Sequence, residues 1–129
     1  MRSVTFRDAL NEALHEEMAR DSSIFVIGED VATHGGNLAV TKGMAEAFPD
    51  RIRETPNSEA AIVGVAVGAA LAGMRPVAEI MYVDFVTCAM DEVVNQAAKM
   101  RYMTGGQASV PMVLRLPCGL SQYTAAQHS

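Results

Sequence analysis

A single carboxylate, Glu59, stands at the head of an otherwise uncharged run of small and apolar residues. The run extends from Ala60 to Gly73 and contains no Asp, Glu, Lys or Arg. Asn57 or Ser58 is expected to cap a helix here, which places Glu59 in the first turn, near the positive end of the helix dipole. The residues alone leave two roles open. Glu59 either satisfies first-turn amide groups, or it presents an acid to a buried partner.

Histidine is the other residue type suited to proton transfer near neutral pH, and the chain contains 3 of them. His128 follows Gln127 in a polar tail, where a histidine is either solvated or catalytic. His15 lies on the polar face of an expected helix and His34 in a glycine-rich loop, and neither has partners at metal-ligand spacing. We therefore predict no metal site and keep His128 as a candidate.

Charge and composition argue against several classes of function. The chain has 10 Lys and Arg against 15 Asp and Glu, so it lacks the basic excess that nucleic-acid binding needs.

Membrane, phosphate-binding and disulfide signals are weak as well. The uncharged run at residues 60–73 is too short and too rich in glycine to span a bilayer, and no basic-then-apolar leader opens the chain. Glycine pairs 35–36 and 105–106 match no phosphate-binding motif and predict turns. Cys88 and Cys118 predict free thiols of a reducing compartment, which favours the cytoplasm.

Alternating helical and strand patterns surround these candidate residues. Apolar residues three and four apart predict helices, and short runs rich in β-branched residues predict buried strands. The expected helices span residues 5–20, 41–48, 59–73 and 84–103, and the expected strands span 22–28, 51–55, 75–83 and 110–116. This alternation predicts a three-layer α/β fold, with a mostly parallel sheet and helices on both faces.

The length of 129 residues suits one domain. A polar tail follows the last expected strand, which indicates a sheet that is incomplete at the C-terminal end. We therefore expect residues 1–129 to be the N-terminal part of a longer polypeptide.

Small residues recur along one face of the expected helix at 59–73. Gly64, Gly68 and Ala72 lie four apart, so they share a face that another backbone can approach closely. Two alternatives remain open for this face: packing within the domain, or contact with another subunit.

Several longer motifs occur together in a fixed order along the chain. They are GEDV, VTKGM, TPNSEAAIVGVAVGAALAGMRPVAE, the DF pair at 84–85, NQAAKMRYMTGGQ, VPMVLR and AQHS. In this order they resemble the N-terminal, pyrimidine-binding domain of the beta subunit of thiamin-diphosphate-dependent 2-oxo acid dehydrogenases, within the transketolase-like superfamily. That family includes pyruvate, branched-chain 2-oxo acid and acetoin dehydrogenases, and the resemblance covers essentially the whole chain.

The resemblance implies roles for particular residues. Glu59 matches the glutamate that hydrogen-bonds a ring nitrogen of the cofactor's aminopyrimidine and thereby helps to activate the thiazolium carbon. A low-dielectric wall is expected around it, because burial favours the protonated carboxyl. Phe85 matches the aromatic residue that packs on the aminopyrimidine, and Met81 is expected to line the same pocket. His128 matches the histidine at the mouth of the substrate channel, and Glu29 matches an acid behind the pyrimidine site.

The resemblance also implies a cofactor and partners. Thiamin diphosphate is the expected cofactor, with its magnesium held by an alpha subunit, because the GDG motif of the superfamily is missing from this chain. A beta–beta contact, a lipoyl acyltransferase, and a 2-oxo acid or acetoin substrate are implied as well. Asn57 stands where a branched apolar residue is common, and Glu92 stands where many members have glutamine, so the subfamily stays open.

Two functions follow from these observations. The first is an enzyme component in oxidative decarboxylation or acetoin cleavage, which acts with an alpha subunit and is inactive as this chain alone. The second is a non-catalytic assembly module that oligomerises through the face formed by Gly64, Gly68 and Ala72.

Overall fold

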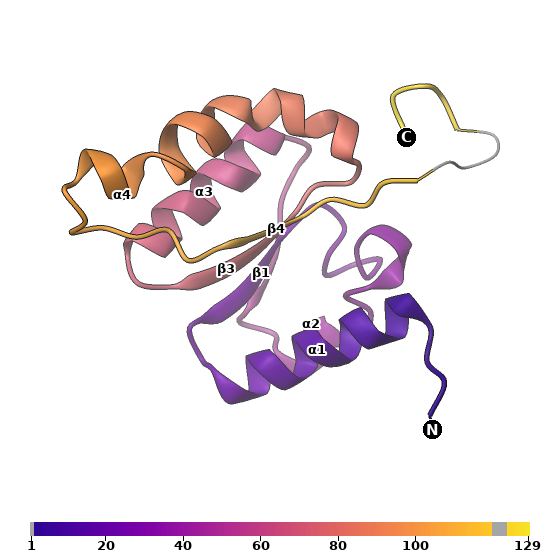
Figure 1. The fold of residues 1–129 in the computed structure, drawn as a ribbon. Helices are drawn as coiled ribbons and strands as arrows, with labels where there is room; N and C mark the ends of the chain where they lie inside the picture. Colours follow the sequence, from indigo (N-terminus) through magenta and orange to yellow (C-terminus); the bar gives the residue numbers. More distant parts are fainter. Residues whose placement is uncertain (1, 120–123) are drawn as a thin grey trace.

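A four-stranded parallel sheet organises the computed structural model, which describes residues 2–119 and 124–129 (Figure 1). The strands are β1 (Ile24–Gly28), β2 (Ile52–Glu54), β3 (Arg75–Glu79) and β4 (Val113–Arg115), in the spatial order β2-β1-β3-β4. Every pairing is parallel, and Gly28 at the end of β1 lies opposite Glu79 at the end of β3. The carboxyl ends of the strands therefore share one edge of the sheet.

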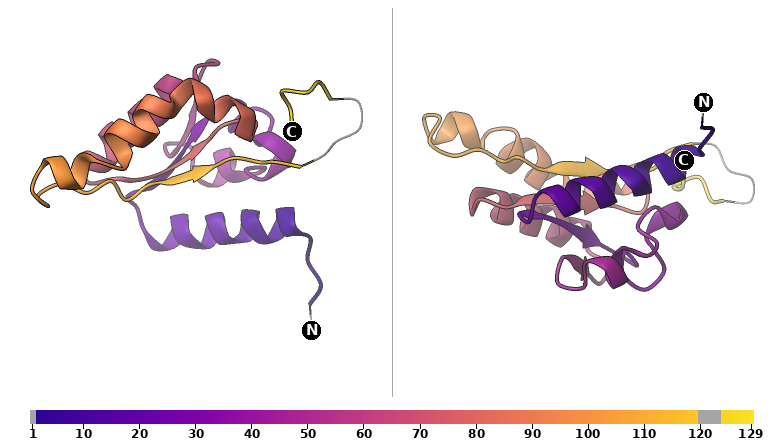
Figure 2. Two further views of the ribbon diagram at one scale, coloured as in Figure 1. Left: turned by 45° about the horizontal axis from the view of Figure 1, so that its top comes forward. Right: turned by 90° about the horizontal axis from the view of Figure 1, so that it is seen from below.

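Helices cover both faces of the sheet, which confirms the predicted three-layer α/β fold. One face carries α1 (Phe6–Arg20) and α2 (Met44–Ala47), and the opposite face carries α3 (Glu59–Leu71) and the residues that follow β3 (Figures 1 and 2). Strand β1 is buried by both layers: Val26 belongs to the core beneath α1, whereas Ile27 packs with Ile62 of α3. This alternation is the period-two pattern of a central strand.

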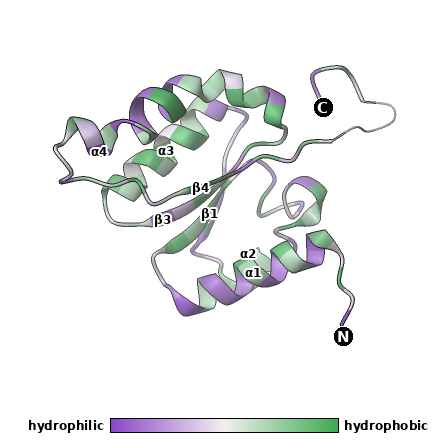
Figure 3. Ribbon diagram, viewed as in Figure 1, coloured by the Kyte–Doolittle hydropathy of each residue, from purple (hydrophilic) through white to green (hydrophobic). Residues whose placement is uncertain are grey.

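Helix α3 begins at Glu59, as predicted, and its inner face is formed of Ile62, Val63, Ala66 and Val67. Most of the helix is apolar, whereas polar and apolar residues alternate along α1 (Figure 3). The expected side-chain cap is absent at the described N-cap residue, because Ser58 makes no capping hydrogen bond.

The helix predicted over residues 84–103 is wrong as a single α-helix. The chain forms a 3₁₀ helix, η2 (Val83–Ala89), a π-helix, η3 (Glu92–Ala97), and a short α-helix, α4 (Met100–Met103). Phe85, Ala89, Val93 and Ala97 lie four apart and all pack on one apolar cluster. Positions four apart drift by about 40° per turn on an α-helix, and the wider π turn reduces that drift.

Other predicted bounds were too generous. The helix expected at 41–48 contracts to α2, after a single 3₁₀ turn, η1 (Asn37–Ala39). The strand expected at 75–83 ends at Glu79, and the strand expected at 110–116 is limited to Val113–Arg115. Of the two strands, β3 pairs with β1 over five positions and β4 pairs with β3 over three.

The face of small residues on α3 is covered only in part. A Cβ added to Gly64 would lie 3.6 Å from Cγ of Glu92, so η3 of the same chain packs at this point. A Cβ added to Gly68 would meet no atom within 4 Å, and Ala72 is exposed. Both alternatives for this face therefore have support: packing within the domain at Gly64, and an open surface at Gly68 and Ala72.

No helix among the described residues is both long and apolar enough to cross a membrane.

The glycines Gly28 and Gly68 supply a matched pair of substitutions to alanine. In Gly28→Ala the new Cβ would lie 2.7 Å from the backbone oxygen of Glu79, so the β1–β3 pairing must shift. We expect a loss of about 1–3 kcal/mol in the free energy of unfolding. Gly68→Ala is unobstructed and removes a helix-interior glycine, so a gain of about 0.5–1 kcal/mol is expected. Denaturant titration of the purified protein measures both, and equal effects of the two variants would contradict this packing.

Candidate functional site

A cavity of about 690 Å³ opens at the carboxyl edge of the sheet. Its position follows from the strand order, because β1 connects to β2 on one side while β3 lies on the other. At such a switch point the loops leaving the two strands separate and leave a crevice. The residues that line it are Glu29, Gly36, Asn37, Leu38, Asn57, Glu59, Met81, Tyr82, Phe85, Cys88 and His128.

Every residue predicted for the site borders this one cavity. Glu29 leaves β1, Met81 and Phe85 follow β3, Glu59 begins α3, and His128 arrives from the C-terminal segment. These positions are far apart in the sequence and meet because the sheet is parallel. Their proximity is a finding of the structure, whereas their individual roles stay predictions.

Glu59 occupies the first helical position of α3 and is half-buried. The low-dielectric wall predicted around it is therefore incomplete among the described residues, since the cavity stays open to solvent. The backbone amides of the first turn of α3 favour negative charge at this position. Glu59 thus lies at the helix end that favours a negative charge, and it also borders the cavity.

A second carboxylate, Glu29, faces the same space. Burial raises the pKa of Glu29 above its ordinary value, and the negative charges of Asp30, Glu59 and Glu54 raise this pKa further. A hydrogen bond from the side chain of Asn57 acts in the opposite direction and lowers the pKa. The side chain of Asn57 therefore hydrogen-bonds Glu29, and Ser58 is the N-cap residue of α3. The site holds neighbouring acids in an environment that favours a proton on Glu29.

His128 lies among aromatic rings at the other side of the cavity. Its ring centroid is 4.8 Å from that of Tyr82 and 5.5 Å from that of Phe85, both in edge-to-face arrangements. Such pairs orient an imidazole without using its nitrogens. Nδ1 of His128 is buried and has no hydrogen-bond partner among the described residues. One ring nitrogen is therefore available for another polar group.

Asp84 holds the segment that carries His128. Its carboxylate accepts hydrogen bonds from the backbone N–H of Ser129 at 2.9 Å and from the Ser129 hydroxyl at 2.6 Å. The side-chain hydrogen bond from Ser129 is the main reason that the pKa of Asp84 lies below its ordinary value. At neutral pH Asp84 is thus an anionic anchor next to the histidine.

Several lining residues have no counterpart in the sequence predictions: Asn37, Leu38, Tyr82 and Cys88. The predicted turn at the glycine pair 35–36 is present, with positive φ at both glycines. The sequence carried no sign that the residues after this turn would reach the site, because their contacts come from β3 and β4. Tyr82 lies three residues before Phe85 of the DF motif, and this closeness in sequence is the one feature that could have pointed to Tyr82 as a site residue.

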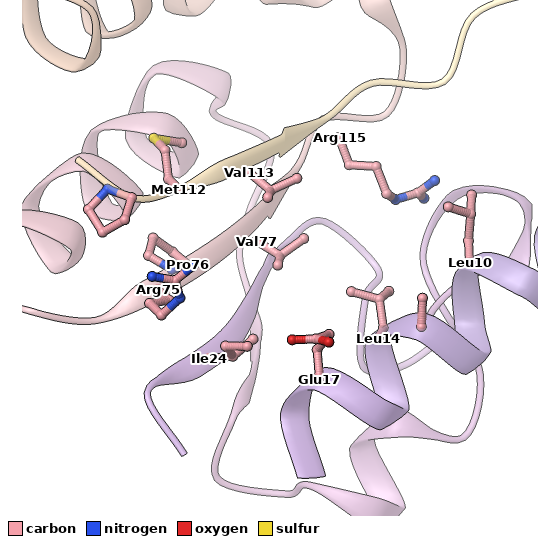
Figure 4. Close-up of a pocket in the computed structure, with 12 residues that line it drawn as sticks. Leu10, Leu14, Glu17, Ile24, Arg75, Pro76, Val77, Met112, Val113 and Arg115 are labelled. Atoms are coloured by element: carbon pink, nitrogen blue, oxygen red, sulfur yellow. The ribbon is translucent and has the colours of Figure 1, made fainter. Parts of the chain in front are cut away.

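A different hollow, of about 430 Å³, lies between α1 and the β3–β4 side of the sheet (Figure 4). Leu10, Leu14, Ile24, Val77 and Val113 are among the residues that line it. Aliphatic side chains predominate here, so this hollow offers little chemistry. The cavity with convergent acids, rings and an imidazole is the better candidate site.

The described residues contain no group of three or more His, Cys, Asp or Glu side chains placed to hold a metal ion.

Comparisons with known proteins show the family of this chain. Residues 2–129 match the family described as transketolase, pyrimidine binding domain. The chain is 50% identical over 127 residues to the pyruvate dehydrogenase E1 component subunit beta of Rickettsia bellii, covering 98% of this chain and 39% of that protein. It is 46% identical over 138 residues to the acetoin:2,6-dichlorophenolindophenol oxidoreductase subunit beta of Cupriavidus necator, covering 99% of this chain and 41% of that protein.

A human relative gives the same result. The mitochondrial pyruvate dehydrogenase E1 component subunit beta is 48% identical over 127 residues, which cover 98% of this chain and 35% of that protein. The chain thus spans between 35% and 41% of the length of these relatives.

The raised pKa of Glu29 predicts a pH-dependent effect of Glu29→Gln. Folding favours the protonated acid, so this group favours the folded state below its ordinary pKa of 4.5, and that contribution is lost as the pH rises through the higher folded value. We expect Glu29→Gln to be more stable than the wild type at pH 7, with a difference that shrinks toward pH 4. Urea titrations across this range measure the difference. A matched Asn57→Ala variant loses the opposing hydrogen bond, so it is expected to raise the pKa of Glu29 further. A gain in stability of Glu29→Gln that does not depend on pH contradicts the prediction.

Proposed function

Because this chain belongs to the family of transketolase pyrimidine-binding domains, we propose that it acts as part of the beta subunit of a thiamin-diphosphate-dependent 2-oxo acid or acetoin dehydrogenase. The observation that carries the proposal is the meeting of Glu59, Phe85, Met81, Glu29 and His128 around one cavity. Relatives named as beta subunits of pyruvate dehydrogenase and of an acetoin oxidoreductase support the same function.

The residues around the cavity fit an aminopyrimidine. A planar heterocycle needs an apolar or aromatic surface for its faces and polar groups for its ring nitrogens. Phe85 and Met81 supply the first, and the carboxylate of Glu59 supplies the second. The volume of about 690 Å³ is sufficient for a ring of this kind.

In this proposal Glu59 holds a proton at its carboxyl oxygen and shares it with a ring nitrogen. When bound, thiamin diphosphate supplies the carbon nucleophile that attacks the carbonyl of the substrate. Glu29 lines the same cavity, and its environment favours protonation, so it adds little negative charge beside Glu59.

His128 acts on the substrate side of the cavity. Tyr82 and Phe85 fix its ring plane, and Asp84 fixes the backbone that follows it. The free Nδ1 is suited to orient a 2-oxo acid or to transfer a proton as the acyl group passes to a lipoyl carrier.

Partners complete the proposed enzyme. We propose that an alpha subunit holds the magnesium and the diphosphate, since the GDG motif is missing from this chain. An alpha subunit would also enclose Glu59, which this chain leaves half-buried. A lipoyl acyltransferase is the proposed acceptor of the product.

A second candidate function, the assembly module, rests on the outer face of α3. Val65 and Leu71 are exposed there beside Gly68, and Met90 and Val94 are exposed on the neighbouring segment. This face is also a candidate for the beta–beta contact of the enzyme. The two functions differ in one observable, because binding of thiamin diphosphate by the isolated chain would contradict a purely structural role.

Glu59→Gln tests the proposed proton donor. In the full natural polypeptide assembled with its partner subunits, we expect turnover to fall by about 10²–10⁴-fold, because the amide cannot supply the proton. Glu46→Gln is the matched control, since Glu46 also lies in the first turn of a helix but is not among the residues that line the cavity. Steady-state assays of 2-oxo acid and acetoin conversion measure the effect. Wild-type turnover in Glu59→Gln, or an equal loss in Glu46→Gln, would falsify the role.

His128→Ala separates substrate handling from cofactor binding. Loss of the imidazole is expected to slow acyl transfer to lipoamide by about 10²-fold, while the Kd for thiamin diphosphate changes little. His34→Ala is a suitable control, because the His34 side chain is 75% exposed and lies outside the cavity. Rapid-mixing assays with lipoamide and titrations with cofactor give the two quantities. If His128→Ala weakens cofactor binding as much as it slows acyl transfer, the proposed role of His128 in substrate handling is wrong.

A further inference from the structure

Glu79, at the carboxyl end of β3, carries a negative charge into the interior of the domain. Its side chain is 1% exposed, and Arg115 of β4 pairs with it. Oε2 of Glu79 accepts hydrogen bonds from Nε of Arg115 at 3.0 Å and from Nη2 at 2.6 Å. The pair is therefore neutral overall, and it adds no net charge to a site that already contains Glu29 and Glu59.

The second carboxylate oxygen of Glu79 contacts the backbone of the loop at Asn37 instead of the guanidinium of Arg115. Oε1 accepts a hydrogen bond from the backbone N–H of Asn37 at 2.6 Å. The Asn37 side chain donates to the backbone oxygen of Met81, and Nη2 of Arg115 lies 3.4 Å from the backbone oxygen of Asn37. Asn37 is thus tied to β3, to β4 and to the residue Met81 that lines the cavity.

Close packing at Gly36 leaves the loop little freedom. A Cβ added there would lie 2.7 Å from Oε1 of Glu79 and 2.9 Å from Oγ1 of Thr41. The φ of Gly36 is +69°, a value that also favours glycine. The backbone can therefore approach the buried carboxylate only because this residue has no side chain.

The loop then adopts a costly backbone conformation. Leu38 and Ala39 both have φ of +58°, in the left-handed region that residues with a Cβ rarely occupy. The Leu38 residue is 69% exposed and borders the cavity. Packing within the described chain does not account for an exposed leucine on such a backbone, and strain of this kind persists only where surrounding contacts impose it.

We propose that the buried Glu79–Arg115 pair is a positioning device that holds residues 36–38 as a wall of the cavity and presents Leu38 to the bound group. Glu79 acts through Asn37, whereas Leu38 makes apolar contact with the heterocyclic face of the ligand. This inference rests on the proposed function, because it takes thiamin diphosphate as the occupant of the cavity.

Leu38→Gly is the decisive variant. Glycine accepts a φ of +58° without strain, so the variant is expected to melt at the same temperature as the wild type or higher. Loss of the leucine side chain is expected to raise the Kd for thiamin diphosphate by about tenfold, because the bound cofactor loses the apolar contact that this side chain provides. A loss of affinity without a loss of stability is an effect that a merely structural residue does not produce.

Glu79→Gln tests the anchor itself. We expect a Kd for thiamin diphosphate about tenfold higher, with kcat at saturating cofactor within about threefold of the wild type, because the loop and not the reacting atoms is displaced. Met18→Ala is the matched control for destabilisation, since Met18 is buried in the core beneath α1, away from the cavity. It is expected to lower the melting temperature and to leave the Kd unchanged.

The experiment uses the full natural polypeptide with its partner subunits and measures cofactor binding by calorimetry beside thermal melting. A wild type that does not bind thiamin diphosphate overturns the proposed function, and this inference with it. A wild type that binds, together with an unchanged Kd in Leu38→Gly, overturns this inference alone, even where Glu79→Gln fails to fold. An equal rise of Kd in Met18→Ala also overturns it, because the effect would then follow stability.

Discussion

Parallel pairing of β1 with β3 is the constraint on which the rest of the structure depends. It places Gly28 opposite Glu79, so both strands end at the same edge, and the order β2-β1-β3-β4 makes the connections diverge there. The cavity is the space between those connections. Glu59 reaches it because α3 begins beside the end of β2, and His128 reaches it because the C-terminal segment returns to Asp84.

Charge is distributed unevenly around this edge, and each carboxylate has a different environment. Glu79 is fully buried and neutralised by Arg115, Asp84 is bound by Ser129, and Glu29 is partly buried beside other acids. Burial and the repulsion of neighbouring acids raise the pKa of Glu29 above its ordinary value. One edge of a small sheet can thus hold a structural anion, an anchoring anion and an acid that favours a proton, because solvation and partners differ over short distances.

Small residues give α3 two different surfaces. Its inner face packs on β1 and β3 through Ile62 and Ala66, while the Gly64 position admits Glu92 from η3. Val93 and Ala97 of the π-helical segment η3 pack on the same apolar cluster as Val63 and Val67 of α3. The open stretch around Gly68 is the part of this surface that neighbouring subunits can use in the proposed enzyme.

The sequence by itself determined the class of fold, most of the elements and the residues of the family motifs. Periodicity is local, so α1, α3 and the strands could be predicted within a few residues. The ordered motifs named Glu59, Phe85 and His128 as candidate site residues. Only the tertiary structure decided the strand order, the π-helical segment and the wall formed by Asn37 and Leu38. The anchor of that wall joins residues 42 and 36 positions apart along the chain. Contacts over such separations leave no local pattern, because they arise only when distant strands end at one edge.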